Sequence, residues 1–243
     1  MMECIPRGLE FFSFKDSPRK KGYLPPEVFR LNADSLRAIE IENASIVHEF
    51  NTPLRNVAHL TILFSKFAVI IPRHLLPSVT HLRVSDWDDP PTPEFFKPFE
   101  DSLVSLHIGD VSCERLGHVL GALPKLEILN LPLDIGLEIS SSSFVHSPRL
   151  KELYIRAYET YGNYLLSPSM EQSFLTLGSY IREFNPYLFP ALVSITVSCD
   201  FPVYDTSRIR GDLHRACQAL AQSLSAPNLQ VTIGIVRYKP KTT

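Results

Sequence analysis

Three of the eight histidines, His59, His81 and His107, lie 22 and 26 residues apart in the chain. Imidazole is a common metal ligand, so such a series could bind zinc. A metal site needs further ligands, and no carboxylate or cysteine falls on the same patch in the arrangement predicted below. We therefore interpret these histidines as polar surface residues and keep a metal-dependent enzyme as an alternative.

Common catalytic motifs are absent from the sequence. It contains no Gly-x-Ser-x-Gly turn of a serine hydrolase, no glycine-rich phosphate loop ending in Lys-Ser or Lys-Thr, and no His-Glu-x-x-His zinc helix. Glycine is scarce, at 10 of 243 residues, which disfavours glycine-rich ligand loops. We expect no enzyme activity, no catalytic residues, no bound metal and no cofactor. Besides the metal-dependent enzyme, a hydrolase remains as an alternative from a different functional class.

The charge balance gives no reason to expect nucleic acid or a membrane as a partner. Lys and Arg total 24 and Asp and Glu total 26, a formal net charge of -2. The longest apolar stretch, residues 60–76, is interrupted by Lys66, Pro72 and Arg73 and is too short for a membrane span. Residues 1–21 contain no signal-peptide core, and the cysteines have no disulfide-type or zinc-type spacing. We expect a cytoplasmic or nuclear protein.

An apolar motif of the form Leu-x-x-Leu-x-Leu, with Ile, Val or Phe permitted, recurs along most of the chain. Its first positions are separated by 27, 21, 22, 24, 23, 24 and 42 residues, and most of these intervals are typical of leucine-rich repeats. The motif alone is close to chance in a chain this rich in aliphatic residues, so the even spacing is the stronger signal. Its three positions are Leu9/Phe12/Phe14, Leu36/Ile39/Ile41, Val57/Leu60/Ile62, Val79/Leu82/Val84, Leu103/Leu106/Ile108, Leu126/Leu129/Leu131, Leu150/Leu153/Ile155 and Leu192/Ile195/Val197.

A proline lies two residues before the first motif position at Pro77, Pro124, Pro148, Pro190 and Pro227. Proline has a fixed φ and no N–H donor, so it cannot continue a helix and ends the connector before a strand. The recurrence of one boundary residue at one offset indicates structural repeats. The sequence therefore predicts an α/β leucine-rich-repeat solenoid, with a curved parallel sheet on the concave side and helices and loops on the convex side.

Three connectors have helical periodicity, at residues 112–121, 168–184 and 212–225. We interpret the apolar stripes of the two longer ones as core. After Leu229 the apolar residues alternate at Val231, Ile233 and Ile235, which predicts a last strand with a shifted register. We expect a single domain over residues 1–243, with about eight to nine irregular repeats over residues 9–236.

Side chains alternate between the two faces of a strand, so motif positions one, four and six should point into the core. Positions three, five and seven should then point to the concave face. Parallel pairing would bring His59 and His81 side by side, with His107 diagonal to them. Tyr and Arg are frequent energetic anchors in protein interfaces. We predict a partner-binding concave face formed by Glu40, Glu42, His59, His81, Arg83, His107, Tyr154 and Arg156.

Several segments resemble the leucine-rich-repeat region of fungal F-box proteins. Leu24-Pro25-Pro26-Glu27-Val28-Phe29 is followed by Ala33-Asp34-Ser35-Leu36-Arg37-Ala38-Ile39-Glu40-Ile41, and the segments at 123–129 and 147–153 are similar. In that family a Leu-Pro-Pro-x-hydrophobic-Phe turn commonly precedes a repeat strand. The repeats hold a target protein, while a separate F-box helix bundle docks on an SCF ubiquitin ligase. The resemblance therefore implies a substrate receptor.

We expect a non-catalytic protein–protein interaction module, the substrate-recognition part of an F-box/SCF-type ubiquitin ligase receptor. Its partner is a protein of unknown identity, with no nucleic acid and no membrane involved. No F-box domain is evident before the first motif at Leu9, so SCF subunits are expected as partners only if an F-box exists elsewhere. A free-standing cytosolic leucine-rich-repeat scaffold or inhibitor is the alternative within the same class.

Overall fold

The computed structural model describes residues 6–15, 26–42, 52–63, 73–85, 92–109, 113–134, 146–158, 188–202 and 230–238. The predicted helices at 168–184 and 212–225 lie outside these residues. The chain forms two compact units, Met1–Asp110 with Gly121–Leu126, and Val111–Leu120 with Glu127–Thr243. The fold is of the α/β class. In the described residues of the first unit, parallel strands alternate with turns and short helices, and helix α3 precedes the parallel strands of the second unit.

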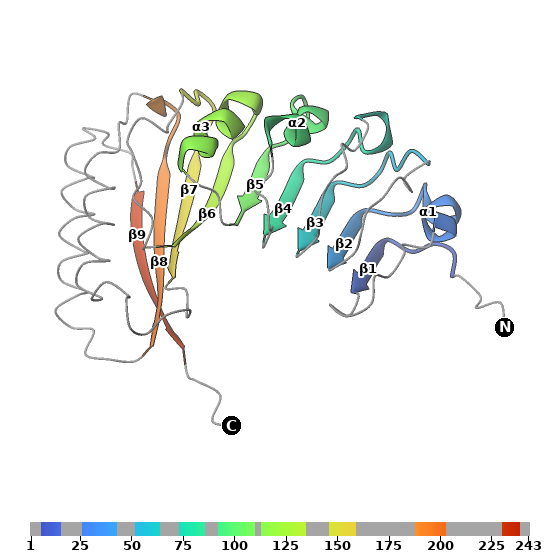
Figure 1. Ribbon diagram of the computed structural model, residues 1–243, viewed down its shortest axis with the longest axis horizontal. Coiled ribbons are helices and arrows are strands. Elements are labelled where there is room, and N and C mark those ends of the chain that lie inside the picture. The colour runs from blue at the N-terminus through green and yellow to red at the C-terminus, as the bar shows by residue number, and fades with distance from the viewer. Residues whose placement is uncertain are drawn as a thin grey trace. The chain divides into compact units, whose positions relative to one another are not determined.

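The first unit is built on five described strands that pair in parallel and in chain order (Figure 1). They are β1 (Phe11–Lys15), β2 (Ala38–Glu42), β3 (His59–Leu63), β4 (His81–Ser85) and β5 (Ser105–Ile108). The register is uniform, so one row of partners runs Phe11, Ala38, His59, His81, Ser105. The connectors contain α1 (Pro26–Asn32), α2 (Pro93–Phe96) and the 3-10 helices η1 (Arg73–Leu75) and η2 (Lys97–Phe99).

The second unit has four described strands, which also pair in parallel and in chain order. They are β6 (Ile128–Asp134), β7 (Glu152–Tyr158), β8 (Ser194–Pro202) and β9 (Gln230–Tyr238). Helix α3 (Cys113–Ala122) precedes β6 in the chain and confirms the helix predicted there. Gly121 lies inside this helix instead of ending it.

The predicted alternation of core and surface residues is confirmed in the described strands. Leu9, Phe12, Phe14 and Leu192 are only partly buried. The other described residues at motif positions one, four and six are at most 3% exposed, because each lies on the face that the connectors cover. These buried residues are Leu36, Ile39, Ile41, Val57, Leu60, Ile62, Val79, Leu82, Val84, Leu103, Leu106, Ile108, Leu126, Leu129, Leu131, Leu150, Leu153, Ile155 and Ile195.

Connector side chains supply the second layer of the core in the first unit. On α1, Val28 and Phe29 are buried, and the Phe29 ring meets the edge of Phe12 with 5.4 Å between ring centroids. The connector before β5 buries a cluster of aromatic rings, Phe95, Phe96 and Phe99. Aromatic pairs in such edge contacts add to the stabilisation from buried apolar area. The connectors therefore cover one face of the strands and leave the other to the side chains described below.

Three of the repeated prolines, Pro124, Pro148 and Pro190, occupy the second position of a β-turn. The N–H groups of Leu126, Leu150 and Leu192 each donate to the carbonyl three residues earlier, at 3.1, 3.3 and 3.0 Å, and the proline lies directly after that carbonyl. A fixed φ near −65° suits this turn position. The predicted boundary is therefore confirmed at Pro124, Pro148 and Pro190, and Pro227 lies outside the described residues.

A second repeated feature sets the register of the strands. The carbonyl of Arg37, at motif position two, accepts hydrogen bonds from the N–H groups of both Ala58 and His59, at 2.9 and 3.2 Å. The carbonyls of Glu10, Ala58, Thr80, Glu127 and Lys151 accept paired bonds from the following strand in the same way. Because one carbonyl oxygen accepts from two consecutive N–H groups, each of these strands begins at the same motif position as the strand before it.

The predicted register shift of the last strand is confirmed. Ile195 pairs with Val231, and Val197 pairs with Ile233. Counted from Leu229, Val231 is at position three, whereas Ile195 is at position four counted from Leu192. The strand therefore starts one residue earlier relative to the motif.

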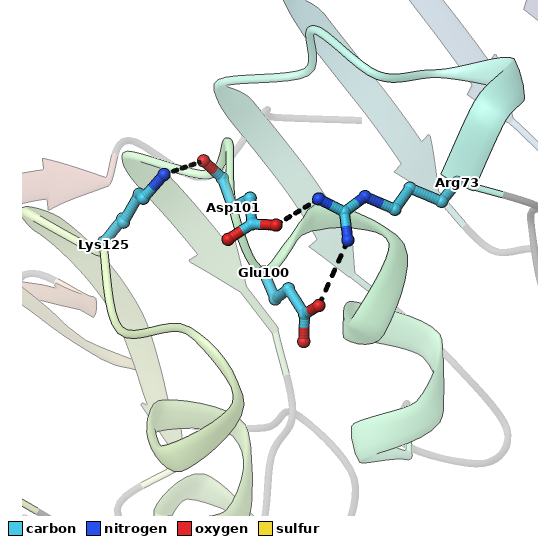
Figure 2. Close-up of polar contacts among 4 residues, drawn as sticks. All are labelled: Arg73, Glu100, Asp101 and Lys125. Carbon is cyan, nitrogen blue, oxygen red and sulfur yellow. Dashed lines mark hydrogen bonds and ion pairs between the residues drawn. The ribbon is translucent and has the colours of Figure 1, made fainter.

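Exposed ion pairs link successive connectors of the first unit (Figure 2). Arg73, in η1, donates to Glu100 at 3.3 Å and also pairs with the carboxylate of Asp101. Lys125, in the turn before β6, donates to the backbone carbonyl of Asp101 at 2.7 Å. Such solvent-exposed pairs contribute at most about 1 kcal/mol each, so they align the connectors more than they stabilise the fold.

Candidate protein-binding face

Six of the eight predicted binding residues lie on one face of the first unit, opposite its core. Of these, His59, His81 and Arg83 are exposed, while Glu40, Glu42 and His107 are partly buried. They come from β2, β3, β4 and β5, and the uniform register places them in adjacent rows. We call this surface the exposed face of the first unit and define it by motif positions three, five and seven of β1–β5.

His59 and His81 are direct partners across β3 and β4, as predicted. Their rings stack with centroids 4.4 Å apart and an angle of 28° between the ring planes. The Thr80 hydroxyl lies 2.9 Å from Nδ1 of His81. Partial burial, and then the nearby charge of His59, lower the pKa of His81 below its usual value. His81 therefore resists protonation in the free protein.

His107 lies opposite Arg83, whereas His81 pairs with Ser105, so His107 is diagonal to the histidine pair as predicted. Within the described ranges, no group of three or more His, Cys, Asp or Glu residues is arranged to hold a metal ion. Arg83 is exposed and has no ion-pair partner in that part of the chain.

The acidic residues of this face lie on β2. The carboxylate of Glu42 receives a hydrogen bond from Lys15 on β1, and the ion pair measures 2.6 Å. The side chain of Glu42 is only 15% exposed, whereas that of Lys15 is 70% exposed. The sequence offered a signal for this pair, because both residues occupy position seven of consecutive motifs. Phe11, at position three of the first motif, also lies on this face and is 55% exposed.

The other two predicted binding residues, Tyr154 and Arg156, belong to β7 of the second unit. The Tyr154 hydroxyl donates to the carboxylate of Glu152, two residues earlier on the same strand face, at 2.7 Å. This bond first, then burial and the carboxylate charge, raise the pKa of Tyr154 above its usual value. Arg156 pairs through its backbone with Pro132 and Ser198, and its side chain lies outside the described residues.

Replacing Glu152 with glutamine should lower the pKa of Tyr154 toward that of an ordinary tyrosine, because the carboxylate charge favours the protonated phenol. Alkaline ultraviolet difference titration of the wild type against Tyr154→Phe isolates this one phenol from the other tyrosines. The difference between Glu152→Gln and the double variant Glu152→Gln/Tyr154→Phe should show a lower titration midpoint for this phenol. An unchanged midpoint would show that the carboxylate does not govern this phenol in solution.

Comparison with known proteins found no matching family model, no matching curated protein and no matching solved structure. Among the described residues, no helix combines the length and apolar character that crossing a membrane requires.

Proposed function

We propose that this chain is a leucine-rich-repeat solenoid that binds a protein partner on the exposed face of its strands. The observation that supports this most directly is the strict alternation in the first unit. Leucine, isoleucine and valine fill one face of β2–β5, and mostly polar side chains occupy the other in register. At motif position two, a carbonyl that accepts two hydrogen bonds recurs from strand to strand, as expected when one repeat stacks on the next.

The composition of the exposed face favours recognition of a protein. Five strands at ~4.8 Å spacing span roughly 19 Å, which is wide enough to contact an extended segment or the edge of a small domain. Arginine, histidine and a phenylalanine that is 55% exposed are available there, and aromatic and arginine side chains are frequent anchors of interfaces. A non-catalytic binding role accounts for these residues without further ligands or cofactors.

Within this class, we propose the substrate-recognition part of an F-box/SCF-type ubiquitin ligase receptor acting in the cytoplasm or nucleus. The support is the resemblance of residues 24–41 to the repeats of fungal F-box proteins. In the described part of that segment, α1 (Pro26–Asn32) leads directly into β2 (Ala38–Glu42). A free-standing scaffold or inhibitor is the second candidate, and it is favoured if ligase subunits do not accompany the partner.

Combined substitution of Arg83, Tyr154 and Arg156 with alanine should reduce partner capture from native-cell extract at least tenfold, because interface anchors commonly contribute more than 1 kcal/mol each. Capture is quantified by mass spectrometry against the wild-type chain. Circular dichroism and the melting temperature should stay close to wild type, since Arg83 is exposed and Tyr154 is only partly buried.

The matched control replaces Arg55, Lys97 and Arg149, which are exposed but lie in turns or connectors. This control should retain capture, and equal loss in both variants would contradict a binding role for the strand face. Repeating the capture with a proteasome inhibitor separates the two candidates. Recovery of SCF subunits with the partner supports the receptor, and their consistent absence favours the scaffold or inhibitor.

A further inference from the structure

The exposed face of β3, β4 and β5 contains no acidic residue among those that the structure describes. Arg83, at the centre of β4, is exposed and lacks an ion-pair partner in the described residues. Titratable side chains surround it at short range. His81 lies two residues earlier on the same strand face, His59 pairs with His81, and His107 lies directly opposite Arg83.

Of the described acidic residues on the strands of the first unit, both are on β2, and neither pairs with Arg83. Glu40 is in the same row as Arg83, but Thr61 of β3 lies between them. Glu42 is already paired with Lys15 at 2.6 Å. Among the described residues, Arg83 therefore has no carboxylate partner, and a bound molecule can supply the opposite charge.

We propose that the exposed face of β3–β5 binds an acidic segment, rich in Asp and Glu, of the protein partner, and that His81 takes up a proton when it binds. This inference rests on the proposed binding function and specifies the chemical class of the partner segment. A carboxylate can accept two parallel hydrogen bonds from the guanidinium of Arg83. Further carboxylates along an extended segment would then lie over the histidines of β3, β4 and β5.

Proton uptake follows from the state of His81 in the free protein. Partial burial, and then the charge of His59, whose ring stacks on it, hold the pKa of His81 below its usual value. A bound carboxylate favours the charged form and opposes both effects. Among the described residues, the charged and titratable groups near the pair are Glu40 from β2, Arg83 from β4 and His107 from β5. The Lys15–Glu42 ion pair joins β1 and β2 further out.

The test uses the full chain and a labelled peptide in which Asp and Glu alternate with Ser, compared with a matched Asn/Gln peptide. Fluorescence anisotropy should show binding of the acidic peptide only. Its affinity should increase at least about threefold between ~pH 8 and ~pH 6, the range in which histidines become charged. Calorimetry near ~pH 6.5 in two buffers of different ionisation enthalpy should show net proton uptake on binding.

Arg83→Gln should weaken acidic-peptide binding at least about fivefold, as expected for loss of a charge-assisted bidentate contact. Arg55→Gln is the matched control, because Arg55 is exposed in a turn before β3, and it should bind like the wild type. His59→Gln combined with His81→Gln should retain most binding at ~pH 8 but lose most of the increase at ~pH 6.

Equal binding of the acidic and Asn/Gln peptides, or no binding of the acidic peptide, would overturn the inference. Equal loss of peptide affinity in Arg55→Gln and Arg83→Gln would also overturn it, as would tighter binding of a single-stranded oligonucleotide than of the acidic peptide. None of these results decides the proposed function. If the alanine variant of Arg83, Tyr154 and Arg156 still loses its captured partner, protein binding on the strand face is retained and only the acidic class fails.

Discussion

Replacing Leu60 with alanine is expected to lower the free energy of unfolding by about 3–4 kcal/mol, the range typical of a fully buried leucine. Leu60 is 1% exposed and lies between Ile39 and Leu82 in one row of the core. The cavity left by the missing side chain is enclosed on both sides by neighbouring strands, so collapse around it is limited. Urea unfolding followed by circular dichroism measures the change as a lower transition midpoint.

Thr61→Ala is the matched control, because Thr61 is the next residue on β3 and faces the opposite side. Its expected effect is below about 1 kcal/mol, as for most substitutions away from the core. Comparable losses in the two variants would mean that the alternation of buried and exposed residues on β3 is incorrect.

Replacing Asn32 with alanine is expected to cost about 2–4 kcal/mol, because several backbone groups lose their hydrogen-bond partner together. Asn32 is 1% exposed. Its side-chain oxygen accepts the N–H of Leu9 at 3.0 Å, and its side-chain nitrogen donates to the carbonyls of Pro6 and Val28 at 3.0 and 2.9 Å. This one amide therefore fastens the segment before β1 to the end of α1.

Asn56→Ala serves as the control for Asn32, since Asn56 makes a single exposed bond from its side chain to the carbonyl of Asp34 at 2.8 Å. Its loss should cost less than about 1 kcal/mol. Asn32→Asp retains an acceptor for Leu9 but removes both donors and adds a buried charge, so it should also be strongly destabilising. Wild-type stability of Asn32→Asp would contradict the hydrogen bonds described for this amide.

The strands could be predicted from sequence because their signals are local. Each motif places apolar residues on one face, and a β-turn proline precedes the motifs that begin at Leu126, Leu150 and Leu192 at a constant offset. The stacking neighbours His59 and His81 followed from equal positions in consecutive motifs. These inferences require only that consecutive strands pair with the same register. The carbonyl at motif position two ensures this by accepting two hydrogen bonds from the next strand.

The connectors could not be predicted to the same degree. Helices α1 and α2 and the two 3-10 helices are three to seven residues long, too short for helical periodicity to stand out. The role of Asn32 depends on partners 23 and 26 residues earlier in the chain. The ion pairs of Arg73 likewise join connectors of unequal length, so no fixed motif offset relates Arg73 to Glu100 and Asp101.

Pairing in strict chain order has a consequence for how recognition by this protein can change over evolution. Within each unit, a described strand is hydrogen-bonded only to the strands before and after it in the sequence. An outward-facing substitution therefore changes one stripe of the surface without altering the packing of the others. Duplication or loss of one strand with its connector would lengthen or shorten the surface while the remaining neighbours keep their contacts.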